Sequence, residues 1–344
     1  MRTDIIKSLI CPDCFSGRLH EEIFDLFNNE DINNGVLVCN NCRNWYPIEN
    51  GLLELLVEPL CYRNDRLAFC RNFSRELKGL GCGFPNIHRG ELDYSEQLKQ
   101  QKHSDWFAVN PECTYTAYQN MPFWKVVDEI SFAEWRKEIK PNSFLLDVGC
   151  AQGRSSFPFM GLDFNMVGFD ISKSLIIEAI QRYKQNKYNA KATFFVADAA
   201  KFPFAASSFD YVLTYGTIHH LPSPKIAFQE IIRVLKPAGI YFGSENNESI
   251  FRTIFDLLQK ALPLWHEEAG STPLICEREV RNLCSGLIDV EVKSMVFVPP
   301  HLVNIVGYKN GKRLLNAFDT MFRCFPVLNK NGGLILIKGK KPKE

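Results

Sequence analysis

The sequence predicts an α/β fold, in which helices cover a mostly parallel sheet. A small cysteine-rich module precedes it in the chain. Three observations support this prediction. Residues 126–247 alternate helical patterns with short apolar strand patterns, which is typical of a parallel sheet covered by helices. Residues 1–57 hold two CxxC pairs between short strand-like runs. The chain has 344 residues, 46% of them hydrophobic, so it can bury one domain of ordinary size plus smaller attachments.

The overall charge and the N-terminal sequence argue against several classes of protein. A net charge of +1 leaves no general basic excess for nucleic acid, so such binding would need a local patch. Residues 1–14 contain no apolar run long enough for a signal peptide, and no run of about 18 apolar residues could span a membrane. We therefore expect a cytoplasmic protein whose 12 cysteines are metal ligands or buried thiols.

Four cysteines of the first segment have the spacing of a metal site. They form two pairs, Cys11 with Cys14 and Cys39 with Cys42. Two thiolates on a tight turn can share one ion, and two such turns complete a tetrahedral sulfur site, which favours zinc. A module of this size buries little core, so the zinc would be structural and contribute about 10–16 kcal/mol of apparent binding free energy. The alternatives are two unrelated surface turns or redox pairs.

The residues around these pairs carry a family resemblance. Leu9-Ile10 precedes the first pair, Leu37-Val38 precedes the second, and Tyr46-Pro47-Ile48 follows with Gly51. This segment resembles the zinc-ribbon family typified by the small activator subunit of tRNA and protein methyltransferases, whose bacterial members read LxCPxC, LxCxxC and YPIxxGIPxLL. Here Leu52-Leu53-Glu54 replaces the usual Ile-Pro. Because all four cysteines are present, the resemblance implies a zinc ribbon over residues 1–57.

A glycine-containing turn follows the first strand pattern of the larger region. Residues 144–148 are an expected strand, and Gly149-Cys150-Ala151-Gln152-Gly153 follows, with a helix expected next. Glycine lets the backbone approach a ligand closely, and the first turn at the carboxyl edge of such a sheet is where nucleotides bind. The dinucleotide pattern GxGxxG is absent, because Ala151 stands at its second glycine.

Further strand patterns end in residues suited to a nucleoside. Residues 166–170 end in Asp170, which can accept hydrogen bonds from ribose hydroxyls, and residues 193–197 lead to Asp198, which can accept from an adenine amino group. Residues 209–215 are a fourth strand, and residues 231–242 give a helix end, a turn and a fifth strand. The alternative role for both acids is to cap strand ends.

This succession over residues 140–243 resembles the class I S-adenosylmethionine-dependent methyltransferases, especially the group around the ubiquinone and menaquinone biosynthesis enzymes. Five motifs match in order, among them LDxGCGxG, GxDxS and RVLKPGG. The resemblance implies a Rossmann-like, seven-stranded, mostly parallel sheet over residues 126–344 that binds S-adenosylmethionine. The implied cofactor residues are Asp147, Gly149, Ala151 and Gly153 at the methionine end, Asp170 at the ribose, Asp198 and Ala199 at the adenine, and Tyr215 and Gly216 at the sulfonium.

Two departures from these motifs concern small residues. Ala151 replaces the middle glycine of the first motif, and a methyl group is small enough that we expect binding to be kept. Ala238 replaces the first glycine of the last motif, which affects only a turn.

Two histidines follow the fourth strand, on the edge where the acceptor should lie. Methyl transfer is an in-line displacement, so the protein mainly positions a nucleophile, and a side chain can also remove its proton. Imidazole titrates near neutrality, which makes His219 and His220 candidate catalytic bases. The alternative is that a histidine only organises the loop, and the recurrence of one at the His220 position in the resembling family favours that role there.

Two segments outside the motifs could contact the acceptor. Residues 58–125 form a linker and an aromatic segment where the relatives place a mobile lid; its aromatic residues are Trp106, Phe107, Tyr115, Tyr118, Phe123 and Trp124. A helical insert is expected at about 299–330, with Leu315, Phe318, Phe322 and Phe325 at helical spacing and basic residues nearby. Such a helix can make peripheral contact with a membrane or a lipid, although its apolar stripe could equally face the core.

Three functions remain in competition. The main hypothesis is methyl transfer to a small-molecule, saccharide or lipid acceptor, at an oxygen. The first alternative is an rRNA or tRNA base methyltransferase that recognises its substrate with the ribbon, but the balanced charge and the lack of an Asn-Pro-Pro-Tyr-like motif after the fourth strand count against it. The second is a non-catalytic protein of the same fold whose ribbon docks a partner, although no partner protein can be identified. Because every cofactor motif lies beyond residue 140, a chain that begins near residue 86 is expected to keep binding the cofactor.

Overall fold

The computed structural model describes residues 1–27, 31–83, 93–110, 120–265 and 274–343. Seven strands form the main sheet in the order β7-β6-β5-β8-β9-β11-β10. They are β5 Phe144–Val148, β6 Asn165–Asp170, β7 Lys191–Ala197, β8 Phe209–Tyr215, β9 Leu235–Asn246, β10 Asp289–Met295 and β11 Leu334–Lys340. The first five are parallel, and β11 runs antiparallel to both of its neighbours. The predicted α/β fold with a mostly parallel main sheet is confirmed, whereas the predicted count of seven strands differs from that of the whole sheet among the described residues, to which the ribbon adds strands.

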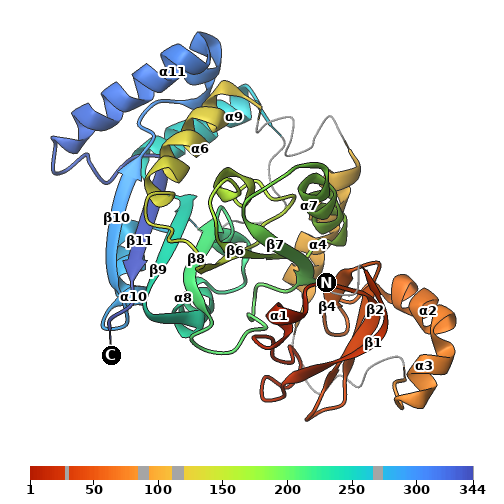
Figure 1. Cartoon of the computed structure of the whole chain (residues 1–344). Helices are drawn as coiled ribbons and strands as arrows, with labels where there is room; N and C mark the ends of the chain where they lie inside the picture. The colour runs from red at the N-terminus through yellow and green to blue at the C-terminus, as the bar shows by residue number, and fades with distance from the viewer. Residues whose placement is uncertain (28–30, 84–92, 111–119, 266–273, 344) are drawn as a thin grey trace.

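The ribbon extends this sheet at its β7 edge, which brings the strand count to eleven (Figure 1). Its strands are β1 Leu19–Phe27, β2 Asp31–Cys39, β3 Trp45–Glu49 and β4 Leu52–Leu55, and helix α1 spans Thr3–Ile6. β4 pairs antiparallel with β3 and parallel with β7, where Glu54 lies opposite Val196 and Leu55 opposite Ala197. One hydrophobic core runs from Leu9 and Leu55 of the ribbon to Phe195 of β7 and Phe204 in the segment between β7 and β8. The ribbon boundary expected at residue 57 stays a prediction.

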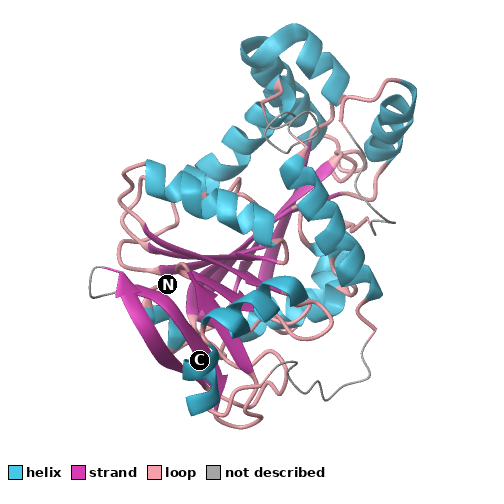
Figure 2. Ribbon diagram, turned by 90° about the vertical axis from the view of Figure 1, so that its right-hand side faces the viewer, coloured by secondary structure: helices cyan, strands magenta, loops and turns pink. Residues whose placement is uncertain are grey.

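Helices cover both faces of the sheet because its strands are apolar on both sides (Figure 2). In β5, for example, all of Leu145–Val148 is buried. The covering helices include α6 Pro122–Trp135, α7 Lys173–Gln185, α8 Pro224–Val234 and α10 Glu277–Cys284. Ser172 and Ser223 cap α7 and α8, since each hydroxyl accepts a hydrogen bond from a backbone N–H in the first turn.

The linker segment is helical and joins the ribbon to the main sheet. It contains α2 Arg63–Asn72, α3 Ser74–Gly79 and α4 Ser95–Val109. α2 and α3 cover the ribbon, where Phe69 and Leu77 pack with Trp45. α4 lies along α7, and Tyr62 ties the two together, because its hydroxyl donates to Asp105 at 2.8 Å and accepts from the Lys173 N–H at 2.8 Å.

The last helices lie at the end of the molecule opposite the ribbon (Figure 1). They are α9 Ile250–Ala261 and α11 Pro300–Arg323, and α11 packs along α6. α11 lies within the insert expected at about 299–330 and is broken at Gly307, whose φ is 79°. Leu315 of its expected stripe is buried, whereas Phe325 is exposed. In the described part of the chain, no helix is long and apolar enough to cross a membrane.

The helix expected directly after the glycine turn is wrong. Residues 151–156 form turns, and only the 3-10 helix η2 Phe157–Phe159 follows. Ala151 and Gly153 have φ values of 47° and 87°, which belong to the left-handed region and interrupt a right-handed helix. Pro158 also lacks the N–H that a continuing helix would need.

Candidate functional site

The four predicted cysteine ligands meet in the ribbon. Their Sγ atoms all lie within 4.8 Å of one another, and the Cys11–Cys42 and Cys14–Cys39 sulfur pairs are 3.6 Å apart. A tetrahedron with zinc–sulfur bonds of about 2.3 Å has edges of about 3.8 Å, so this arrangement fits one zinc ion. The cluster confirms the predicted zinc ribbon. With four thiolates the coordination shell is complete, so the zinc is structural.

Neighbouring groups shape this zinc site. The N–H groups of Asn41 and Cys42 point at the Cys39 sulfur from 3.4 Å, and such contacts stabilise a thiolate. A Cβ atom at Gly17 would lie 2.1 Å from the Cys39 sulfur, so only glycine fits there. Gly17 was not recognised from the sequence, because nothing marks a glycine between two CxxC pairs as part of a metal site.

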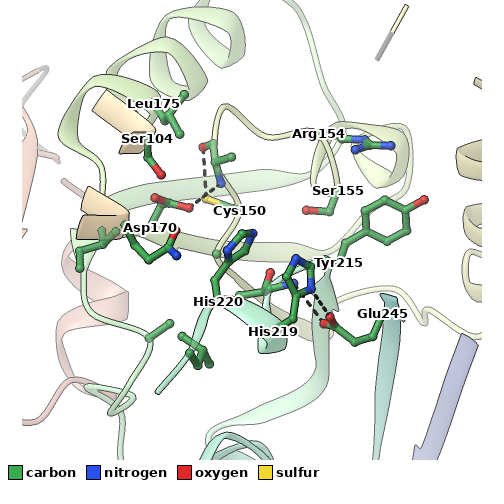
Figure 3. Close-up of a pocket in the computed structure, with 18 of the residues that line it drawn as sticks. Ser104, Cys150, Arg154, Ser155, Asp170, Leu175, Tyr215, His219, His220 and Glu245 are labelled. Carbon is green, nitrogen blue, oxygen red and sulfur yellow. Dashed lines mark hydrogen bonds and ion pairs between the residues drawn. The ribbon is translucent and has the colours of Figure 1, made fainter. Parts of the chain in front are cut away.

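A pocket lies at the carboxyl edge of the main sheet, beside the β5 turn (Figure 3). Seven of the nine predicted cofactor residues line it: Gly149, Ala151, Asp170, Asp198, Ala199, Tyr215 and Gly216. They come from the ends of four neighbouring strands, which brings together residues that are far apart in sequence. His219 and His220 also line the pocket.

Asp170 holds the turn that forms the pocket floor. Its Oδ2 accepts a hydrogen bond from the Ala151 N–H at 3.0 Å, and its Oδ1 accepts from the Ser172 N–H at 2.9 Å. Burial raises the pKa of Asp170, while these bonds lower it. Each carboxylate oxygen has a second lone pair, so Asp170 can still accept from two ribose hydroxyls.

Asp198 is the residue predicted at the adenine, and Tyr215 is one of those predicted at the sulfonium. Burial raises the pKa of Asp198 to about 6, although its Oδ1 accepts from the Ala200 N–H at 2.8 Å. The Tyr215 hydroxyl donates to Asp128 at 2.7 Å, and Asp128 also pairs with Arg154. The Arg154 guanidinium stacks 4.7 Å from the centre of the Trp124 ring. The pocket wall around Tyr215 therefore combines aromatic and charged side chains.

The other two predicted cofactor residues are not among those that line the pocket. Asp147 is fully buried beneath the turn, where its carboxylate accepts from the hydroxyls of Ser155 at 2.8 Å and Ser156 at 2.5 Å. Burial raises the pKa of Asp147 to about 7. A Cβ at Gly153 would lie 2.2 Å from Phe157. Both residues shape the turn from behind, and their assignment to the methionine end stays a prediction.

A buried carboxylate orients His219. The 3-10 helix η3 Ile218–His220 carries both histidines, and the His219 Nδ1 lies 2.7 Å from Oε2 of Glu245 on β9. Because a carboxylate only accepts, Nδ1 donates, and in the neutral ring Nε2 is then the basic nitrogen. Oε1 of Glu245 accepts from the N–H groups of Thr217 at 3.1 Å and Ile218 at 2.9 Å, which fixes the loop. Figure 3 shows His219 turned toward Glu245, with His220 beside it.

Comparison with known families agrees with this geometry. Residues 146–243 match the family model described as a methyltransferase domain, and residues 5–51 match that of Trm112p-like proteins. The chain contains a Trm112p-like zinc ribbon followed by a class I methyltransferase domain. Both parts of the predicted resemblance are confirmed.

Individual relatives are similar over part of their length. A sterol 24-C-methyltransferase of Schizosaccharomyces pombe is 34% identical over 32% of this chain and 29% of its own. A demethylmenaquinone methyltransferase of Renibacterium salmoninarum is 30% identical over 39% of this chain and 55% of its own. The chain thus spans about half or less of these relatives. A solved complex of the Haloferax volcanii Trm112 methyltransferase activator with a methyltransferase matches 71% of this chain and 98% of its own, at 15% identity and a TM-score of 0.49.

The aromatic segment contributes part of the pocket of the methyltransferase domain. Phe107 of α4 and Trp124 of α6 line it, whereas Trp106 is exposed and Phe123 is buried beside Trp124. Tyr115 and Tyr118 lie outside the described residues. α4 also contributes polar residues that the sequence analysis missed, namely Gln97, Gln100 and Ser104. Glu245 was missed as well, although a carboxylate near the end of an apolar strand is a signal that could have found it.

Cofactor affinity of the methyltransferase domain is expected to depend on Asp170. Asp170→Ala removes the acceptor for the ribose hydroxyls, at about 1.5–3 kcal/mol, so S-adenosylhomocysteine should bind about tenfold more weakly or worse in calorimetry. Asp163→Ala is the control, because Asp163 is exposed, precedes β6 and lies outside the pocket. Equal affinities for the two variants would contradict the ribose assignment.

Proposed function

We propose that this chain transfers a methyl group from S-adenosylmethionine to an oxygen of a small-molecule, saccharide or lipid acceptor. The match to the methyltransferase domain family supports the cofactor, and so do the acids at the ends of β6 and β7. The relatives named for a sterol and a quinone support a small acceptor rather than a macromolecule.

The observation that carries the proposal is the His219–Glu245 pair in the pocket wall. A hydroxyl is a weak nucleophile until it loses its proton, so an oxygen acceptor benefits from a base, whose contribution is about 10²–10⁴-fold in rate. His219 takes that proton at Nε2, and the buried Glu245 carboxylate stabilises the imidazolium through Nδ1. The bound cofactor supplies the activated methyl group on its sulfonium.

The other residues hold the reactants in line. Gly149 and Gly216 have positive φ values of 66° and 65°, which lets the backbone come close to the cofactor. Asp170 takes the ribose and Asp198 the adenine. α4 covers the pocket with Phe107, which excludes water and raises the effective strength of the polar contacts inside.

The test uses labelled S-adenosylmethionine and an extract of cells that lack the protein. The purified chain should place label in the lipid or polar small-molecule fraction, and His219→Asn should place much less there. Label in the RNA fraction would contradict the proposal and favour the base methyltransferase instead. Tight S-adenosylhomocysteine binding with no label in any fraction would favour a non-catalytic protein.

A further inference from the structure

Helix α9 leaves a row of apolar side chains exposed. Its inner side carries both apolar and polar side chains: Phe255 is buried, and Gln259 is buried and bonds to the Trp265 carbonyl at 2.7 Å, while Arg252 bonds to Asp256 at 2.7 Å. Its outer side is apolar as well, with Ile254 44% exposed and Leu257 62% exposed. Amphipathic helices of globular proteins normally bury the apolar side.

The inner side of α9 lines a side cavity next to the cofactor pocket. Arg252, Asp256 and Gln259 line this cavity, and α11 closes it with Pro300 and His301. Four residues line both the cavity and the cofactor pocket: Trp124, Asn246, Trp265 and Leu334. The side cavity therefore lies directly beside the cofactor pocket, with these four residues between them.

Exposed apolar side chains also lie where α9 meets α11. His301 Nε2 bonds to the Leu262 carbonyl at 2.7 Å and so joins the end of α9 to the start of α11. Leu262 and Leu302 on either side of this bond are exposed, and Ile305 one turn further is 81% exposed. Exposed apolar side chains grouped at the junction of two helices suit an interaction site.

The two helices are basic as well as apolar. Together they carry six Lys and Arg residues and two Asp residues. One of the two, Asp256, pairs with Arg252, and the other, Asp319, is buried and accepts the Val296 N–H at 3.1 Å. The net charge of the two helices is therefore positive, and Lys260, Lys309 and Arg313 are exposed. Apolar side chains beside exposed cations suit an anionic lipid surface.

We propose that α9 and the start of α11 dock this chain on an anionic lipid bilayer. Ile254, Leu257 and Ile305 enter the outer part of the bilayer, while the basic side chains meet the lipid headgroups. The side cavity then opens at the membrane surface, so the acceptor is a lipid whose polar end passes α9 into the cofactor pocket and whose chain stays in the bilayer. This statement about the acceptor rests on the proposed methyl transfer, whereas the docking itself does not.

Sedimentation with vesicles tests the docking without any assay of activity. The full chain is mixed with vesicles of phosphatidylglycerol and phosphatidylcholine, or of phosphatidylcholine alone. We expect binding to the anionic vesicles that weakens with salt and falls at least tenfold in Ile254→Asp. Ile226→Asp on α8 is the matched control, because Ile226 is 45% exposed and lies outside both cavities, and it should bind as the native chain does.

Two results would overturn the docking. One is equal vesicle binding by Ile254→Asp and Ile226→Asp. The other is a native dimer in light scattering that Ile254→Asp dissociates, with no vesicle binding, because the face would then contact a second copy. S-adenosylhomocysteine calorimetry separates this failure from failure of the proposed function, since it measures the cofactor pocket alone. Label on a water-soluble acceptor, with vesicle binding intact, would overturn only the lipid acceptor.

Discussion

His219→Asn is expected to lower the rate of methyl transfer by about 10²–10⁴-fold. Asparagine can still donate toward Glu245, so the loop held by the Thr217 and Ile218 N–H groups should keep its shape. It cannot take a proton, so the acceptor hydroxyl would have to react with its proton in place. The measurement is the single-turnover rate with labelled S-adenosylmethionine as a function of pH.

Two further variants separate a base from a structural histidine. Glu245→Gln keeps an acceptor oxygen but loses the negative charge that stabilises the imidazolium, so kcat should fall while S-adenosylhomocysteine affinity stays within a few-fold. His220→Asn should cost much less than His219→Asn, because the Glu245 carboxylate bonds to His219. If His219→Asn keeps the native rate and pH profile, His219 is not the base, and the argument for an oxygen acceptor loses its main support.

Loss of zinc is expected to unfold more than the ribbon. Structural zinc contributes about 10–16 kcal/mol, which is as large as the whole stability of a typical domain. The ribbon core is continuous with that of the main sheet through Leu55 and Phe204, and β4 covers the β7 edge. The native chain should carry one zinc, and Cys39→Ser should lose it and unfold cooperatively at a much lower temperature.

Cys324→Ser is the matched control for this experiment, because Cys324 is exposed and outside the cysteine cluster. It should retain one zinc and the native unfolding temperature, measured by metal analysis and calorimetry in reducing buffer. A folded native chain with almost no metal would contradict the zinc ribbon. Zinc loss in Cys39→Ser without a change in the unfolding of the methyltransferase domain would show that the two parts are energetically separate.

The structure opposes the expectation that a chain beginning near residue 86 keeps its cofactor site. Such a chain would leave the β7 edge without β4 and expose the core behind it. It would also lose Leu60 and Tyr62, which hold α4 over the pocket through Gln101 and Asp105. We expect the shortened chain to aggregate or to bind S-adenosylhomocysteine more weakly than the full chain.

The sequence by itself determined the parts whose signals are local. A CxxC pair places two thiolates on one turn, so the zinc ligands can be recognised from Cys11, Cys14, Cys39 and Cys42 without knowing the fold. An apolar strand that ends in an acid or a glycine turn can be recognised in the same way. Because parallel strands bring their carboxyl ends to one edge, the order of the motifs was enough to gather Gly149, Asp170 and Asp198 around one pocket.

Only the tertiary structure decided which separate elements touch. Glu245 bonds to His219 because β9 lies beside β8, and nothing in the sequence between these two residues indicates the pair. β4 pairs with β7 because the backbone N–H and C=O groups at the two sheet edges form hydrogen bonds with each other. The pattern of a strand in the sequence does not specify which edge it will pair with. The sequence of α9 is rich in apolar residues, but which of them are buried depends on what packs against the helix. Here Phe255 is buried, and Ile254 and Leu257 are left exposed.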